Sequence, residues 1–380
     1  MKIIFLFLKN NKIIYNSIKM IIIVIIKKMA SKRQQLDEGY IKKIYQEICE
    51  HVEEFKKEVK PDEEAFDNWA KMICQPKFKL IKSLVYLLEQ EDTDFQDKEM
   101  IFSIFNHILL INPNSANQMI KFESLPKILV DYLFKYRKEK EKNDICAINT
   151  LSYTFKIDQY QKLINLELIT IILDSLTIVK EQNVLESLIR ILIEINSTYK
   201  KLDKNIFLEA YHNNENAHLV GEVILRLLNS EKNQAFIEKI LYCIKRLMDK
   251  ENKDIFYSKD LEAFIDIAIR YLESTDNNEL RCFVLEVLQR ITKFNEFFVI
   301  MYKTKEMQDL LDDYIKSDKV NEKVKNISRI ILNNFAKNLK RQLLVKSGMK
   351  LEDINKLVEE EEDEDEEGEE EEDDEQEVKK

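Results

Sequence analysis

Residues that could do chemistry are few and widely spaced in this sequence. The four histidines are His51, His107, His212 and His218, and only the last two lie close together, beside Glu215. A zinc site needs four protein ligands, or three and a water molecule. This short, Asn-rich segment offers two histidines and one carboxylate. We therefore expect no metal site and interpret His212 and His218 as exposed loop residues.

The sequence also lacks the motifs that build a nucleophile or a phosphate site. No Gly-x-Ser-x-Gly elbow occurs. The glycines lie too far apart for a phosphate-binding loop, at Gly39, Gly221, Gly348 and Gly368. Adjacent carboxylates such as Asp312 and Asp313 would point about 100° apart on a helix, so they cannot converge on one bond. We expect no catalytic residue, no cofactor and no small-molecule substrate, and thus a protein that is not an enzyme.

The cysteines give a prediction about the compartment. They are scattered, without a Cys-x-x-Cys pair, at Cys49, Cys74, Cys146, Cys243 and Cys282. An odd number of dispersed cysteines within apolar patterns is typical of buried free thiols in a reducing environment. We therefore expect a cytoplasmic protein.

The glycine and proline content indicates an all-α fold. Of 380 residues, 45% are hydrophobic, but only 4 are Gly and 4 are Pro. Average usage is about 7% Gly and 5% Pro. Tight β-hairpin turns need residues that tolerate positive φ, so the composition excludes a β-sandwich or β-barrel.

Acidic charge is concentrated near the C-terminal end. Every residue of 359–377 except Gly368 and Gln376 is Asp or Glu, and this run accounts for the formal net charge of −11. The rest of the chain is nearly neutral, whereas a nucleic-acid binder needs a basic excess; we expect no nucleic-acid partner. Such charge density opposes folding, so residues 351–380 are predicted to be a disordered acidic tail.

Two roles for this tail remain open. It either solvates the chain without binding anything, or it docks. Docking would be onto a basic partner, or back onto basic residues of this chain, namely Lys337, Lys340, Arg341, Lys346 and Lys350.

Residues 1–28 combine lysines with apolar patches and contain no acidic residue. The longest apolar run, Met20 to Ile26, is far shorter than the about 20 residues that span a bilayer, so we expect no membrane span. Lys27 and Lys28 stand where a signal peptide would carry small residues. We expect a translated leader that is not native to the working protein, which would start at Met29, or a disordered segment. A targeting segment and an ordinary helix are the alternatives.

Between about residues 36 and 345, apolar stripes alternate with short polar breaks. Three stripes have the i, i+3, i+4 spacing of amphipathic helices, at Val220–Leu228, Leu261–Leu272 and Leu280–Ile291. Each predicted helix must cover its apolar face with a neighbour. The sequence therefore predicts a chain of packed short helices.

Similar helix endings recur roughly 40 residues apart, within the range of armadillo and HEAT units. They are Leu109–Asn114, Tyr153–Asp158 and Ile191–Asn196, and the Asn or Asp in each is expected to end an inner helix. The spacing becomes irregular beyond about residue 200. We predict an armadillo-like helical solenoid, a right-handed superhelix of stacked helices, over residues 29–350. A helix bundle is the alternative.

Two segments resemble the leucine-rich domain of the WISH/DIP/SPIN family, which includes the NCK-interacting protein with an SH3 domain and its fungal relatives. The first is VGEVILRLLN at residues 220–229. The second, at residues 255–270, reads Phe-Tyr-x-x-Asp and then Ile-Asp-Ile-x-x-Arg. The resemblance is expected to cover about residues 80–335.

This resemblance implies a function as well as a fold. It implies an armadillo-repeat protein that binds the actin-related protein 2/3 complex and activates it without a preformed filament, seeding unbranched actin filaments. Actin itself would be a second partner. The expected location is the cytoplasmic actin cytoskeleton, at the cortex or at endocytic sites.

Polar residues of the two motif helices are the candidates for contact with that partner. They are Glu222, Arg226, Asn229, Lys259, Glu262, Asp266 and Arg270. A simpler interpretation competes, because Glu222 and Arg226, like Asp266 and Arg270, are spaced i, i+4 and would form ordinary intrahelical pairs.

The start of the second motif has a structural interpretation of its own. Ser258 or Asp260 is expected to cap the helix, and Phe256 and Tyr257 are expected to be core anchors.

A different binding class is the main alternative function. A generic armadillo adaptor or scaffold would hold peptide or protein partners, such as transport cargo, with the tail as a tether in the scaffold case. Nuclear import receptors line their groove with repeated Trp and Asn, whereas this chain has one Trp, Trp69.

Overall fold

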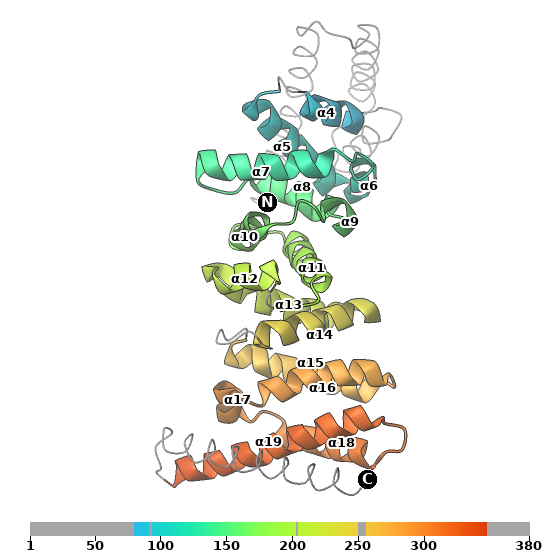
Figure 1. Cartoon of the computed structure of the whole chain (residues 1–380), viewed down its shortest axis with the longest axis vertical. Helices are drawn as coiled ribbons and strands as arrows, with labels where there is room; N and C mark the ends of the chain where they lie inside the picture. Colours follow the sequence, from blue (N-terminus) through green and yellow to red (C-terminus); the bar gives the residue numbers. More distant parts are fainter. Residues whose placement is uncertain (1–79, 91–92, 203, 250–255, 348–380) are drawn as a thin grey trace, which may run out of the picture. The chain divides into compact units, whose positions relative to one another are not determined.

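The computed structural model describes residues 80–90, 93–202, 204–249 and 256–347, and every regular element in these ranges is helical (Figure 1). The all-α prediction is confirmed for this part of the chain. None of its helices combines the length and apolarity needed to cross a membrane. The predicted leader and the predicted acidic tail lie outside the described residues.

The chain divides into two compact units, residues 1–191 and 192–380. Helices of the first unit are α4 (Leu80–Glu89), α5 (Phe95–Ile111), α6 (Ala116–Met119), α7 (Leu125–Lys140), α8 (Ile145–Thr154), α9 (Ile157–Tyr160) and α10 (Leu166–Ser175), with the 3-10 turn η2 (Pro113–Ser115). The unit boundary falls within α11 (Gln182–Thr198). The prediction of a single armadillo-like domain over 29–350 stays a prediction.

The helices of the second unit differ widely in length. They are α12 (Ile206–His212), α13 (His218–Ser230), α14 (Gln234–Asp249), α15 (Ser258–Ser274), α16 (Asn278–Ile291), α17 (Asn295–Ile300), α18 (Thr304–Lys316) and α19 (Glu322–Lys346), with the 3-10 turn η3 (Glu215–Ala217).

Corresponding helices of successive repeats stack on one another. In the second unit α13 packs on α15, while α14 packs on α16 and α16 packs on α19 (Figure 1). In the first unit α5 packs on α8 and α7 packs on α10. Stacked repeats of two or three helices are the arrangement of armadillo-like proteins, so the solenoid prediction is confirmed within each unit.

Hydrogen bonds between repeats keep a regular spacing in the second unit. The Tyr271 hydroxyl donates to the Leu228 carbonyl at 2.7 Å, 43 residues away. The Tyr314 hydroxyl donates to the Leu272 carbonyl, 42 residues away. The expectation that the repeat becomes irregular beyond about residue 200 is therefore wrong. The donor in each bond is a tyrosine hydroxyl and the acceptor is a backbone carbonyl, so any residue type at the acceptor position can make the bond.

The three predicted apolar stripes face the interior. Their buried members are Val220, Val223, Ile224, Leu227 and Leu228 on α13, Leu261, Phe264, Ile265, Ala268, Ile269 and Leu272 on α15, and Leu280, Val284, Val287, Leu288 and Ile291 on α16. Burial of these stripes is the main favourable term in the stacking, at about 25 cal/mol for each Å² of apolar surface removed from water.

Asn and Asp side chains mostly begin helices in this chain. Helices α5, α8, α10, α12, α16 and α19 start after residues whose side-chain oxygen accepts a backbone N–H of the first turn, namely Asp94, Asp144, Asn165, Asn205, Asn277 and Asn321. A side-chain oxygen can satisfy the unpaired N–H groups at a helix start.

The sequence predicted that an Asn or Asp ends a helix at three positions, namely Asn112, Asp158 and Asn196. This prediction is wrong at two of them. Asp158 lies in the first turn of α9, and Asn196 lies within α11. Asn112 does cap the C-terminus of α5, but through its backbone N–H, which donates to the Ile108 carbonyl.

In the second unit a buried arginine donates hydrogen bonds to carbonyls at the C-terminal end of α11. Arg246 is 2% exposed, and its Nη1 donates to the Tyr199 carbonyl at 2.6 Å and to the Asn196 carbonyl at 3.1 Å. Its guanidinium lies 4.9 Å from the centre of the Tyr242 ring. A cation at a helix C-terminus interacts favourably with the partial negative charge of the carbonyls there.

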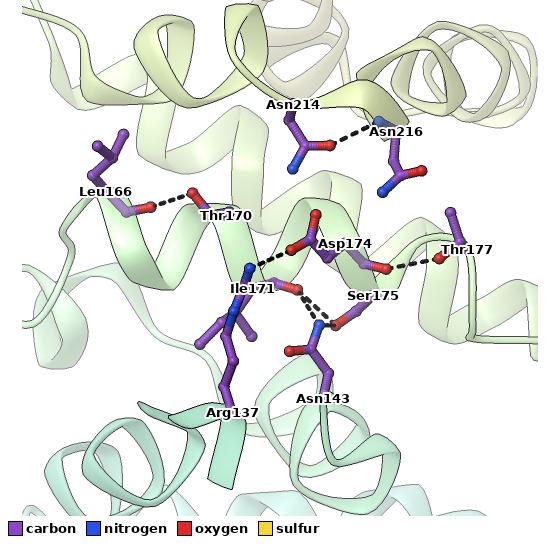
Figure 2. Close-up of polar contacts among 10 residues, drawn as sticks. All are labelled: Arg137, Asn143, Leu166, Thr170, Ile171, Asp174, Ser175, Thr177, Asn214 and Asn216. Carbon is purple, nitrogen blue, oxygen red and sulfur yellow. Dashed lines mark hydrogen bonds and ion pairs between the residues drawn. The ribbon is translucent and has the colours of Figure 1, made fainter. Parts of the chain in front are cut away.

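The first unit uses polar bridges between α7 and α10, shown in Figure 2. Arg137 Nη2 lies 2.7 Å from Asp174 Oδ2. Asn143, which follows α7, donates from Nδ2 to the Ile171 carbonyl and to Ser175 Oγ, at 3.1 Å in each case. These contacts fix the position of α10 against the preceding repeat.

In the second unit one carboxylate joins three stacked helices. Glu286 of α16 lies 2.6 Å from Lys245 Nζ of α14 and 2.8 Å from Lys323 Nζ of α19. Burial alone would raise the pKa of Glu286, but hydrogen bonds and attraction from the two ammonium groups outweigh it, so the pKa is lowered.

Replacing this carboxylate should produce a pH-dependent loss of stability. Glu286→Gln should lower the free energy of unfolding by about 1–2 kcal/mol near neutral pH, because both lysines lose their anion. The folded-state pKa of Glu286 lies below its unfolded-state value of about 4.3. The stabilisation is therefore complete above that value and is lost as the pH falls through the folded-state pKa.

Urea unfolding from about pH 7 down to about pH 3 measures this effect. The gap between wild type and Glu286→Gln should shrink with acid. Glu273→Gln, at an exposed position of α15, is the control and should show no such gap. A Glu286→Gln gap that stays constant across this range would contradict the role given to the carboxylate.

Candidate functional site

Helix α13 exposes the polar row that the sequence predicts. Glu222, Arg226 and Asn229 are all exposed. Arg226 Nη2 lies 2.8 Å from Glu222 Oε1, so the predicted intrahelical pair is present. Both side chains remain largely in water, where such a pair contributes only a few tenths of a kcal/mol. The pair can therefore be rearranged by a partner at little cost.

The start of α15 separates the roles of three motif residues. Phe256 is 2% exposed and stacks on Phe264 at 5.9 Å between ring centres. Tyr257 is 64% exposed. The Asp260 carboxylate accepts a hydrogen bond from the Tyr257 backbone N–H at 3.1 Å, which makes Asp260 the capping residue rather than Ser258.

The prediction that Tyr257 is a core anchor is therefore wrong, whereas that for Phe256 is confirmed. The backbone at Tyr257 is extended, with φ −74° and ψ 167°. Side chains of adjacent residues in extended backbone point to opposite sides. One aromatic ring of the pair enters the core and the other faces solvent.

Asp266 forms its ion pair with another repeat rather than along α15. Its Oδ1 lies 3.0 Å from Lys303 Nζ, and its Oδ2 accepts from the Tyr302 hydroxyl at 3.4 Å. The prediction of an Asp266–Arg270 pair is corrected accordingly. The hydrogen bond to Asp266 raises the pKa of Lys303, while desolvation and the nearby Asp266 carboxylate raise the pKa of Tyr302.

The connection between α17 and α18 has a constrained backbone. Met301 and Lys303 adopt positive φ values of 43° and 48°, a conformation that costs a non-glycine residue about 1–2 kcal/mol. Lys303 is held there by Asp266 and by Glu306 at 3.5 Å. The result is that Tyr302 and Lys303 are presented beside α15.

Arg270 and Tyr271 contact the last turn of α13. Arg270 Nη2 lies 3.5 Å from the Asn229 carbonyl, and its guanidinium lies 5.6 Å from the centre of the Tyr271 ring. Tyr271 donates to the Leu228 carbonyl. Burial is the main cause that raises the pKa of Tyr271. These bonds satisfy carbonyls that a helix end leaves unpaired.

We call the resulting region of the second unit the α13–α15 surface. It consists of Glu222, Arg226, Asn229, Tyr257, Lys259, Glu262, Asp266, Arg270, Tyr302 and Lys303. Of the predicted residues, six are exposed and Glu262 is half-buried. Helix α15 packs against both α13 and α17, so residues from three repeats contribute (Figure 1).

The charges of this surface are mixed and locally paired. Such a surface has little long-range attraction for any one sign of charge, but it can select the orientation of a partner whose charges complement it. The exposed Tyr257 and the half-buried Tyr302 supply contact area with a polar end, as contact residues of protein interfaces do. The arrangement suits protein binding.

The described residues contain no group of three or more His, Cys, Asp and Glu side chains that could hold a metal ion. His212 and His218 are exposed, and His218 Nδ1 lies 3.0 Å from the Glu215 carbonyl. The described cysteines Cys146, Cys243 and Cys282 are free thiols.

Three residues of this surface were missed by sequence reasoning. Tyr257 has a signal, since it directly precedes a helix start and adjoins a core aromatic residue. Tyr302 and Lys303 have none, because their place beside Asp266, some 36 residues earlier in the chain, follows from the packing of repeats.

The sequence matches a protein-family model, whereas a search of curated proteins found no match. Residues 181–307 match the family model described as SPIN90/Ldb17, leucine-rich domain. This match confirms the WISH/DIP/SPIN resemblance seen in the two motifs, and it contains the entire α13–α15 surface. The broader extent, about residues 80–335, stays a prediction. Over residues 181–307 the chain is thus similar to SPIN90/Ldb17 proteins.

The opposite roles of the two motif aromatics can be tested by a matched pair of truncations. Phe256→Ala should lower the free energy of unfolding by about 3–5 kcal/mol, because it empties a core position. Tyr257→Ala should change it by less than about 0.5 kcal/mol, because the ring faces solvent. Chemical denaturation measures both values. Equal losses would show that Tyr257 is also part of the core.

Proposed function

We propose that this chain, which carries a SPIN90/Ldb17 leucine-rich domain, binds the actin-related protein 2/3 complex and activates it without a preformed filament. It would thereby seed unbranched actin filaments, with actin as a second partner, in the cytoplasmic actin cytoskeleton at the cortex or at endocytic sites. The observation that carries the proposal is the family match, whose residues 181–307 include both motif helices and the α13–α15 surface.

The mechanism is a shift of population rather than a reaction. A partner that binds the active arrangement of the complex more tightly than the inactive one raises the active fraction. A change from 1:99 to 99:1 needs about 5.5 kcal/mol of preference between the two states. A standard interface of roughly 1,600 Å² with a few anchor residues can supply this.

The α13–α15 surface has features that fit this task. Its backbone belongs to stacked helices and to the constrained turn at Met301–Lys303, so little ordering is required on binding. Tyr257 and Tyr302 would act as anchors, and the mixed charges would fix the orientation of the complex. We place the contact here.

Charge reversal on this surface should weaken binding without unfolding the protein. The double variant Arg226→Glu and Arg270→Glu should raise the Kd for the complex by about 10- to 100-fold, because two attractive contacts become repulsive. Its melting temperature should stay close to wild type, since both side chains are exposed. Equilibrium binding of labelled complex measures the effect.

The control is a second pair of charge reversals away from this surface. Lys127→Glu and Lys162→Glu change two exposed lysines of the first unit and should leave the Kd unchanged. Wild-type affinity in the Arg226/Arg270 variant would remove the α13–α15 surface from the interface. If wild-type protein also fails to bind the complex or to accelerate actin assembly, the adaptor or scaffold alternative stands instead.

A further inference from the structure

Helix α19 carries an apolar stripe that the described residues leave in solvent. Leu339 and Leu343 are 51% and 60% exposed, Ala336 is exposed and Leu332 is half-buried. These four residues follow the spacing of one helix face. The buried face of α19 is a different one and includes Val324, Ile327, Ile331 and Phe335. Exposed apolar stripes of this kind mark contact sites.

The charge of α19 is equally uneven. The helix contains one acidic residue, Glu322, against seven basic residues, namely Lys323, Lys325, Arg329, Lys337, Lys340, Arg341 and Lys346. On the line of the stripe, closer to the helix start, lie Lys325 and Arg329. A ligand that follows this line from the helix end would meet apolar residues first and basic residues second.

The sequence that follows α19 has the complementary order. Leu351, Ile354 and Val358 have helical spacing in residues 349–358, and the acidic run 359–377 comes directly afterwards. Ser347 caps the helix and Gly348 follows it, at the position where glycine favours a reversal of chain direction. Ten helical residues span about 15 Å, and the stripe from Leu343 back to Leu332 spans about 16 Å.

From these observations we propose that residues 349–377 dock antiparallel on α19. Leu351, Ile354 and Val358 cover the stripe of Leu343, Leu339, Ala336 and Leu332, and the acidic run continues over Arg329 and Lys325. The acidic segment is thus an internal ligand of α19, and it lies near the basic residues of that helix. The proposal is independent of the proposed function.

Two arguments favour this segment over a second copy of the chain. A short tether gives the segment an effective concentration in the millimolar range, which a separate molecule would have to match. A second α19 would also bring like charge against like charge, because the helix is strongly basic, whereas the segment 359–377 has the opposite sign.

Hydrogen–deuterium exchange of the full chain tests the docking. Backbone amides of residues 349–358 should exchange at least about tenfold more slowly than in an unstructured peptide. The double variant Leu339→Glu and Leu343→Glu should abolish this protection, because the stripe becomes polar and repels the acidic run. Thermal melting checks that the rest of the fold is retained.

A matched control exists on the other flank of the same helix. Ile330→Glu and Val345→Glu introduce the same charges at positions that are 43% exposed but lie off the stripe, and should leave the protection in place. Unprotected amides in wild type, or protection that survives Leu339→Glu and Leu343→Glu, would overturn the proposal. Protection that rises with protein concentration, together with a dimeric mass, would overturn it in favour of a second copy.

Discussion

The long helices that the structure describes have apolar faces that can be buried only against other helices, and repetition of similar helices meets this constraint. In the second unit each helix covers the stripe of its counterpart in the next repeat, and hydrogen bonds between residues 42 and 43 positions apart hold the register. Because stacking buries the apolar faces of α13 and α15, the residues left exposed on these two helices are mostly polar. The position of the α13–α15 surface is thus a consequence of how the core is built.

Polar links between repeats add specificity to this packing. Tyr271, Tyr314 and Arg246 donate to backbone carbonyls, and Glu286 joins Lys245 and Lys323. A buried donor or acceptor that loses its partner costs free energy, so a slipped stack would leave several such groups unpaired. The same links make the surface on α13 and α15 a preorganised one, which is what a protein that must prefer one state of its partner requires.

The sequence predicted the elements of this fold better than their contacts. The stripes of α13, α15 and α16 could be read from spacing alone, because each depends on residues within one helix. The intrahelical pair Glu222–Arg226 was predictable for the same reason. Asp266 was assigned the wrong partner because Lys303 reaches it from the next repeat. Tyr257 was placed in the core because its aromatic character was weighed above its position at an extended helix start.

The family motifs, by contrast, indicated a function, which the spacing of apolar residues within a helix cannot do. Phe-Tyr-x-x-Asp combines a core ring, an exposed ring and a helix cap in five residues. Only the structure separates these roles, and only the exposed ring is available to a partner. A motif defined by sequence thus mixes residues that build the domain with residues that could recognise another protein.

Our central proposal is that this chain activates the actin-related protein 2/3 complex by binding alone. Imaging of single filaments tests it most directly, with purified chain, complex and actin monomers and no filament seeds. The account predicts that new filaments appear faster, that they are linear, and that the labelled chain is found at one end of each. Filament numbers equal to those without the chain, or new filaments that appear only as branches on older ones, would contradict it.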